Sequence, residues 1–169
     1  ITMNAPSGAR AGAPYENDPD SRVDWKGVVY PGCAVTQNVG AGQDYLAISA
    51  AVAALPTTLS GLSCVVIRDG GTYNEQVKIQ GFTNNGYRIS IFADPGSGLS
   101  PVVIPPTFST GAFVIMNAGV TVAGIDIQAS AAFVPYGVQA SSAYVTISSV
   151  NVNSFTTIYV AGVSLSSYS

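Results

Sequence analysis

Residues 119–127 have the sequence Gly-Val-Thr-Val-Ala-Gly-Ile-Asp-Ile, and residues 143–152 follow the same pattern with Ala-Tyr-Val-Thr-Ile-Ser-Ser-Val-Asn-Val. In this alignment Gly119 corresponds to Ala143, and a second, weaker match places Tyr136 on Ile158. Repeats of roughly 20 to 50 residues are typical of solenoids, and several short apolar runs in each copy favour parallel β-strands. The repeat therefore predicts a parallel β-helix.

Apolar and polar residues alternate in each copy, so one face of every strand is expected to be buried. The residues predicted to point inward are Val120, Val122, Ile125 and Ile127 in one copy and Val145, Ile147, Val150 and Val152 in the next. Those predicted to point outward are Thr121, Asp126, Thr146 and Asn151. The alternation changes phase at residues 123–124 and 148–149, where we expect a sharp corner between two sheets.

Short apolar runs bounded by Gly, Ser, Asn or Pro extend this pattern along the chain. We predict strands at residues 64–67, 88–92, 102–104, 112–116, 119–122, 125–127, 136–139, 144–147, 150–152 and 157–160. Most are shorter than the about five or six residues usual in sandwich strands. A β-sandwich remains the alternative fold.

One helix is predicted before the strands, at about residues 44–55. Its apolar face is formed by residues at spacings of four, three and four, namely Ile48, Val52, Leu55 and Leu59. Asp44 is the expected N-cap, and Pro56 ends the helix. A helix of this length does not form a core alone, so we expect it to cover the apolar end of the solenoid.

Residues 1–34 differ from the rest in their prolines and acidic residues, and we predict an extended Pro-rich arm. Trp25 is expected to anchor this arm, and residues 28–30 are a candidate strand. Residues 35–169 are expected to form the β-helix domain, which either continues into further coils or packs on a partner at its C-terminal end. Cys33 and Cys64 are compatible with one disulfide outside the cell or with two buried thiols inside it.

Charge is scarce: 9% of residues are charged, and the formal net charge is −3. Six Lys and Arg residues cannot form a nucleic-acid footprint, and no apolar stretch approaches the about 20 residues of a membrane-spanning helix. The absence of His excludes Ser-His-Asp systems and His-ligated metals. We expect no nucleic-acid partner, no membrane insertion, no cofactor and no metal.

Residues 44–56 (Asp-Tyr-Leu-Ala-Ile-Ser-Ala-Ala-Val-Ala-Ala-Leu-Pro) and 64–77 (Cys-Val-Val-Ile-Arg-Asp-Gly-Gly-Thr-Tyr-Asn-Glu-Gln-Val) resemble the N-terminal part of pectin methylesterases. Those enzymes belong to the pectin-lyase-like superfamily of right-handed β-helices. There, a D-Y-x-x-I-x-x-A-V-x-x-x-P helix caps the first coil, and a G-T-Y-x-E-x-V strand opens the solenoid. The resemblance implies an all-β, right-handed parallel β-helix with an N-terminal capping α-helix, in which Glu75 is a structural hydrogen-bond acceptor.

The chemistry of that family is not carried over. Its esterases use two aspartates, two glutamines and an arginine on one outer sheet face. Residues 113–160 offer Asp126, Gln128 and Gln139, without a second carboxylate or an arginine, and Asp126 aligns with a non-catalytic position. Glycoside hydrolysis likewise needs two facing carboxylates. We therefore assign no catalytic residue and expect no catalysis within these 169 residues.

Three functional hypotheses follow. After Asp94, Asp126 is the one carboxylic side chain and no Lys or Arg follows, so the surface is rich in hydroxyls and amides. We favour a non-catalytic module, extracellular or at the cell surface, with a structural or adhesive role and weak binding of a polysaccharide or glycan. The alternatives are the N-terminal part of a carbohydrate esterase or lyase whose catalytic coils are missing, and a self-assembling subunit of a fibre or spike.

Candidate glycan-binding residues combine aromatic rings with amides. They are Tyr136, Gln139, Tyr144, Asn151 and Tyr159. Sugars stack on aromatic rings and form hydrogen bonds with amides, whereas the alternative is that the tyrosines pack between neighbouring coils.

Overall fold

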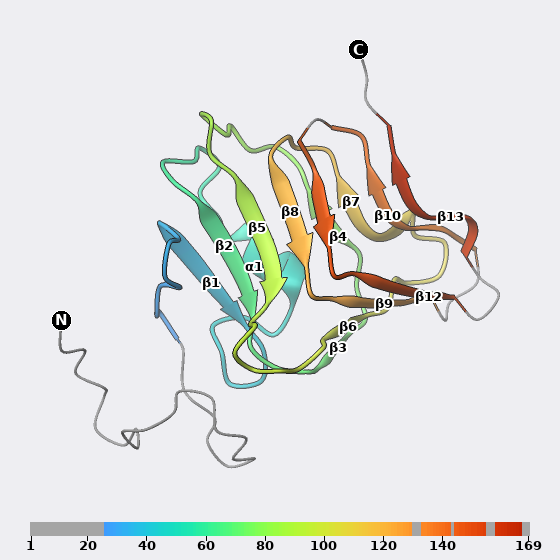
Figure 1. The fold of residues 1–169 in the computed structure, drawn as a ribbon, viewed down its shortest axis with the longest axis horizontal. Coiled ribbons are helices and arrows are strands. Elements are labelled where there is room, and N and C mark those ends of the chain that lie inside the picture. The colour runs from blue at the N-terminus through green and yellow to red at the C-terminus, as the bar shows by residue number, and fades with distance from the viewer. Residues whose placement is uncertain (1–25, 130–132, 143, 155–157, 167–169) are drawn as a thin grey trace.

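The computed structural model describes residues 26–129, 133–142, 144–154 and 158–166. Within these ranges the chain forms one short helix and 13 strands, which wind into a parallel β-solenoid of about five turns (Figure 1). The predicted parallel β-helix is therefore confirmed, and the sandwich alternative is wrong because every strand pairing is parallel.

Three sheets run along the solenoid, and each full coil contributes one strand to each of them. Sheet 1 contains β1 (Val35–Val39), β2 (Ser63–Ile67), β5 (Ile89–Ala93), β8 (Val120–Ala123) and β11 (Thr146–Ser148). Sheet 2 contains β3 (Thr72–Tyr73), β6 (Val102–Val103), β9 (Asp126–Ala129) and β12 (Asn151–Ser154). Sheet 3 contains β4 (Val77–Ile79), β7 (Gly111–Ile115), β10 (Val134–Ala140) and β13 (Ile158–Leu165).

The register of the strands corrects both predicted alignments. Thr121 pairs with Thr146 in the structure. The alignment of Gly119 with Ala143 instead places Thr121 on Val145. Tyr136 pairs with Ala161 and not with Ile158. Burial decides the register, because a slip of one position would turn every inward side chain of a strand toward solvent.

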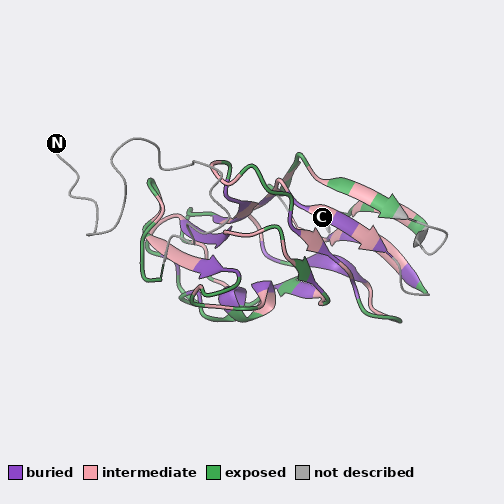
Figure 2. Cartoon of the chain, turned by 90° about the horizontal axis from the view of Figure 1, so that it is seen from below, coloured by how far each residue is buried: buried purple, intermediate pink, exposed green. Residues whose placement is uncertain are grey.

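The predicted inward residues form the core. Val120, Val122, Ile125 and Ile127 are fully buried. Their counterparts in the last described coil pack against the core but are only partly buried, namely Val145, Ile147, Val150 and Val152. Figure 2 shows the buried residues along the strands and most exposed residues in the connections.

The predicted corner between two sheets is also present. Gly124 has a φ of +68° and Ser149 a φ of +51°, and both lie between a strand of sheet 1 and a strand of sheet 2. A Cβ at Gly124 would lie 3.4 Å from the Cβ of Ala93 in the preceding coil, and the left-handed backbone there favours glycine. The phase change in the sequence therefore marks a real turn.

The helix α1 (Ile48–Ala53) is shorter than the predicted span of 44–55, and it begins after Ala47. The prediction that Asp44 is the N-cap is wrong. Its carboxylate instead accepts hydrogen bonds from the Gly27 N–H and the Asn38 side-chain amide. The apolar face itself is confirmed, since all four predicted residues are buried, although Leu55 and Leu59 follow the helix rather than belong to it.

Other local predictions need correction. Residues 28–30 do not form a strand, and the side chains of Val28 and Val29 are exposed. The strands β1, β3 and β4 are absent from the predicted set. The centre of β1 is polar and β3 has two residues, too few to show alternation, whereas β4 does alternate over its three residues and was not predicted. Most of the predicted arm, with Trp25, lies outside the described residues.

Candidate functional site

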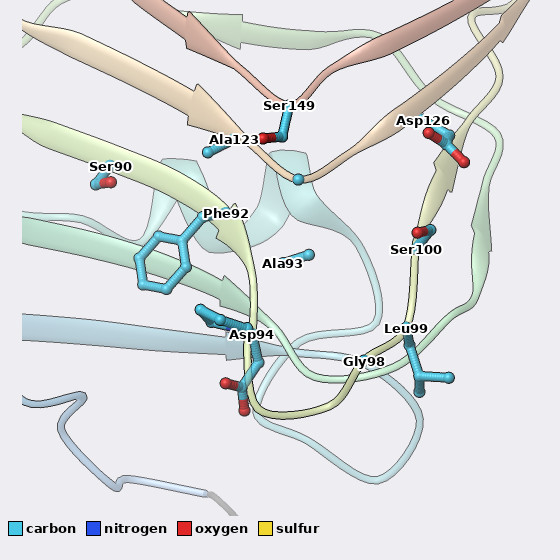
Figure 3. A pocket seen from close by; sticks show the side chains of 12 residues that line it. Ser90, Phe92, Ala93, Asp94, Gly98, Leu99, Ser100, Ala123, Asp126 and Ser149 are labelled. Atoms are coloured by element: carbon cyan, nitrogen blue, oxygen red, sulfur yellow. The ribbon is translucent and has the colours of Figure 1, made fainter.

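A groove runs along the outside of the corner between sheet 1 and sheet 2, with a cavity volume of about 590 Å³. Ser90 and Phe92 of β5 line one side, and Ser100 and Asp126 line the other, as Figure 3 shows. Ser149 lies at the rim. The groove therefore spans residues from three successive coils.

Small residues create this groove. Ala93, Ala123 and Gly124 line it between its two sides, and none of them carries a side chain larger than a methyl group. A larger outward side chain at Ala123 would fill the space along the corner. The groove is thus a consequence of the same residues that allow the tight turn between the sheets.

Phe92 is held in place from outside the groove. Its ring meets the ring of Tyr30 edge-on, with centroids 5.0 Å apart and planes at 77°. The Arg68 guanidinium lies 5.4 Å from the centroid of the Tyr30 ring, and the Tyr30 N–H donates to the Thr36 hydroxyl at 2.8 Å. These contacts fix an aromatic side chain at the edge of the groove.

Four of the five carboxylates in the described residues are bound by the fold, and Asp94 is the most buried example. It forms an ion pair with Arg68 at 2.8 Å and accepts a hydrogen bond from the Gly96 N–H at 3.0 Å. Arg68 also donates from Nε to the Asn38 side-chain oxygen at 2.9 Å. Although Asp94 lines the groove, each of its two carboxylate oxygens already has a partner within the fold.

Asp69 has a similar structural role. Its carboxylate accepts hydrogen bonds from the backbone N–H groups of Ala41 and Gly71 and from the Tyr73 hydroxyl, at 2.7, 3.1 and 2.6 Å respectively. Burial of the phenol, followed by its hydrogen bond to Asp69, raises the pKa of Tyr73 well above its ordinary value. This pair stabilises the turn that leads into β3.

Glu75 binds the start of α1. Its two carboxylate oxygens accept hydrogen bonds from the backbone N–H groups of Ile48 and Ser49, at 2.7 and 2.9 Å. These are donors that the helix itself leaves without a partner, and Ala47 at the N-cap supplies no side-chain acceptor. The expectation that Glu75 is a structural acceptor is confirmed.

Asp126 differs from these other carboxylates. Within the described residues its carboxylate has no hydrogen-bond or ion-pair partner, and the side chain is half-buried. It lies in β9 opposite Asn151 of β12, and Gln128 lies opposite Asn153 in the same two strands. The outer face of sheet 2 therefore presents one carboxylate and three amides beside the groove.

The five predicted glycan-binding residues do not lie on one face. Tyr136, Gln139 and Tyr159 belong to sheet 3, and the side chain of Tyr159 lies outside the described residues. Tyr144 precedes β11 and is 80% exposed. Only Asn151 is next to the groove, through its pairing with Asp126. Sequence reasoning missed the groove, although the outward position of Asp126 is visible in the repeat.

Cys33 and Cys64 are joined by a disulfide, with their Cα atoms 6.0 Å apart. The bridge connects the segment before β1 to β2, beside the N-terminal edge of sheet 1. It therefore links the end of the predicted arm to the solenoid.

Comparison with protein-family models, with curated proteins and with solved structures gives no match to this chain. Among the described residues, no helix has the length and apolarity needed to cross a membrane. The same residues contain no group of three or more His, Cys, Asp or Glu side chains placed to hold a metal ion.

Proposed function

We propose that this chain is a non-catalytic β-helix module, extracellular or at the cell surface, with a structural or adhesive role. One observation supports the non-catalytic part of the proposal: the fold itself uses Asp44, Asp69, Glu75 and Asp94 as hydrogen-bond acceptors. Hydrolysis of a glycosidic bond requires a pair of carboxylates with different roles, and ester hydrolysis by carboxylates requires the same. Asp126, the one other carboxylate among the residues that the structure describes, does not supply such a pair by itself.

We also propose a right-handed winding, with α1 closing the N-terminal end of the solenoid, as in the pectin-lyase-like superfamily. Parallel strands joined by crossovers are overwhelmingly right-handed. Helix α1 packs against β1, β2 and β4, and its Ile48, Ala51 and Val52 are buried. The hydrogen bond between Glu75 and α1 connects the two motifs on which the resemblance rests, which supports a shared first coil.

An activity panel tests the non-catalytic role. The purified chain is incubated with methyl-esterified pectin, polygalacturonate and neutral polysaccharides, and released methanol, unsaturated ends and reducing ends are measured. We expect no product above the buffer level for the wild type or for Asp126→Asn. Turnover that the wild type shows and Asp126→Asn loses, while its thermal unfolding is unchanged, would overturn the proposal.

A second candidate function, a subunit of a fibre or spike, is favoured by the edge strand β13. Val160, Val163 and Leu165 in this strand are 60%, 41% and 66% exposed. An exposed apolar edge is a template for pairing with another chain. Sedimentation over a range of concentrations tests this role: assembly that Val163→Lys abolishes supports it, and a monomer at every concentration contradicts it.

A further inference from the structure

We propose that the groove between sheet 1 and sheet 2 binds a neutral carbohydrate chain, with Phe92 and Asp126 as its principal contacts. The inference rests on the adhesive part of the proposed function and gives it a site and a ligand class. None of the five glycan-binding residues predicted from the sequence lines this groove. One of them, Asn151, lies next to it because it pairs with Asp126.

Phe92 supplies the apolar contact. A sugar ring has faces made of C–H groups, and these pack on aromatic side chains, while its hydroxyls need polar partners around the edge. The ring of Phe92 is already fixed by Tyr30 at 5.0 Å, so binding costs little side-chain entropy at this position. The small residues beside it leave room for a ring to enter.

Asp126 supplies the polar contact. Its unengaged carboxylate accepts hydrogen bonds from hydroxyl groups, and such charge-assisted bonds are stronger than neutral ones. The paired Asn151 amide both donates and accepts, and Ser100 and Ser149 add hydroxyl groups that have no hydrogen-bond partner within the described ranges. The pairing of Asp126 with Asn151 on neighbouring strands places an acceptor next to a donor, and a sugar hydroxyl needs both.

Charge selects a neutral ligand. No Lys or Arg lies among the lining residues, and Arg68 beside the groove is already paired with Asp94 at 2.8 Å. Asp126 therefore gives the groove a net negative charge, which repels uronates and sulfated sugars. This preference is opposite to the one expected of a site for acidic pectin.

Binding to a panel of neutral oligosaccharides (glucan, mannan, galactan and xylan fragments) and of oligogalacturonates tests the inference, with isothermal titration of the best neutral binder. Asp126→Ala removes the polar contact from a side chain that the fold does not use, and Ala123→Trp fills the groove from an outward position. Gln139→Ala on sheet 3 is the matched control. Circular dichroism melts verify the fold of each variant.

We expect at least one neutral oligosaccharide to bind, at least a tenfold loss for Asp126→Ala, no detectable binding for Ala123→Trp, and no change for Gln139→Ala. Absence of binding, tighter binding of oligogalacturonates, or equal affinity for the wild type and both groove variants would overturn the site. Those results would leave the non-catalytic role intact, because that role fails only if the activity panel detects turnover.

Discussion

Glu75 and Ile48 lie far apart in the chain, yet the carboxylate of Glu75 accepts a hydrogen bond from the Ile48 N–H at 2.7 Å. The first full coil thus supplies the N-terminal acceptor that α1 lacks locally. This bond couples the formation of the helix to the winding of the coil, because it forms only when both α1 and the segment that carries Glu75 are in position.

The first prediction concerns this bond. Glu75→Ala should lower the free energy of unfolding by about 1–2 kcal/mol, the range measured when a helix N-cap is lost. Glu75→Gln should cost less, because it keeps one carbonyl acceptor. Chemical denaturation measures both. A free energy of unfolding that Glu75→Ala leaves unchanged would contradict this role of the bond.

The second prediction concerns two glycines of sheet 3. A Cβ at Gly137 would lie 2.5 Å from the Gly162 carbonyl oxygen, whereas a Cβ at Gly162 would come no closer than 3.7 Å to Val152. Gly137→Ala should therefore destabilise the protein by about 1–3 kcal/mol, as overpacking does. Gly162→Ala is the matched control and should be near neutral in thermal unfolding. Equal melting temperatures would show that the coils are spaced differently.

The third prediction concerns the disulfide. The bridge between Cys33 and Cys64 closes a loop with a sequence separation of 31. Cys33→Ser combined with Cys64→Ser should lower the free energy of unfolding by about 2–4 kcal/mol. Alkylation of the unfolded wild-type protein without reductant, followed by mass measurement, should label neither cysteine. Two labelled thiols in protein from its native source would contradict the bond.

The fourth prediction concerns pH. Burial and the hydrogen bond to Asp69 raise the pKa of Tyr73 in the folded protein above the value of about 10 that an unfolded chain has. The folded state then holds the phenolic proton more tightly, so the stabilisation is complete below about pH 10 and is lost as the pH rises above it.

Comparison with Tyr73→Phe isolates this effect, because the remaining tyrosines are common to both proteins. The difference in unfolding free energy between wild type and Tyr73→Phe should shrink between about pH 9 and about pH 11. A difference that stays constant across this range would contradict the raised pKa.

The fold could be predicted from the sequence wherever buried and exposed side chains alternate regularly along a strand. Val120 and Val122 alternate with Thr121, and the phase change at Gly124 marks the corner, so both the strands and their inward faces are visible in the sequence. The register was harder, because it depends on connection lengths that carry no periodic signal. The alignment of the two copies places Thr121 on Val145, one position away from Thr146, its partner in the structure.

The candidate site could not be predicted in the same way. The groove exists because Ala93 and Ala123, which are separated by a whole coil in sequence, are both small and line the same corner. Asp126 stands out only after Glu75, Asp69 and Asp94 are known to be engaged. The tyrosines were predicted as ligand contacts because they are aromatic, but aromatic character does not determine which sheet a side chain lies on.

The constant step between the last described coils also makes length adjustable. Asp126 pairs with Asn151 and Val138 with Val163, so sheets 2 and 3 advance by the same number of positions from one coil to the next. Insertion or deletion of a segment of that length would leave all the remaining coils in register. Each added coil would lengthen the molecule by about 4.8 Å, the spacing between neighbouring strands. A gene duplication inside this region would therefore extend the solenoid by one coil. Coils of another length, such as the one from Ile89 to Val120, keep their strands in register because the connections take up the extra residues.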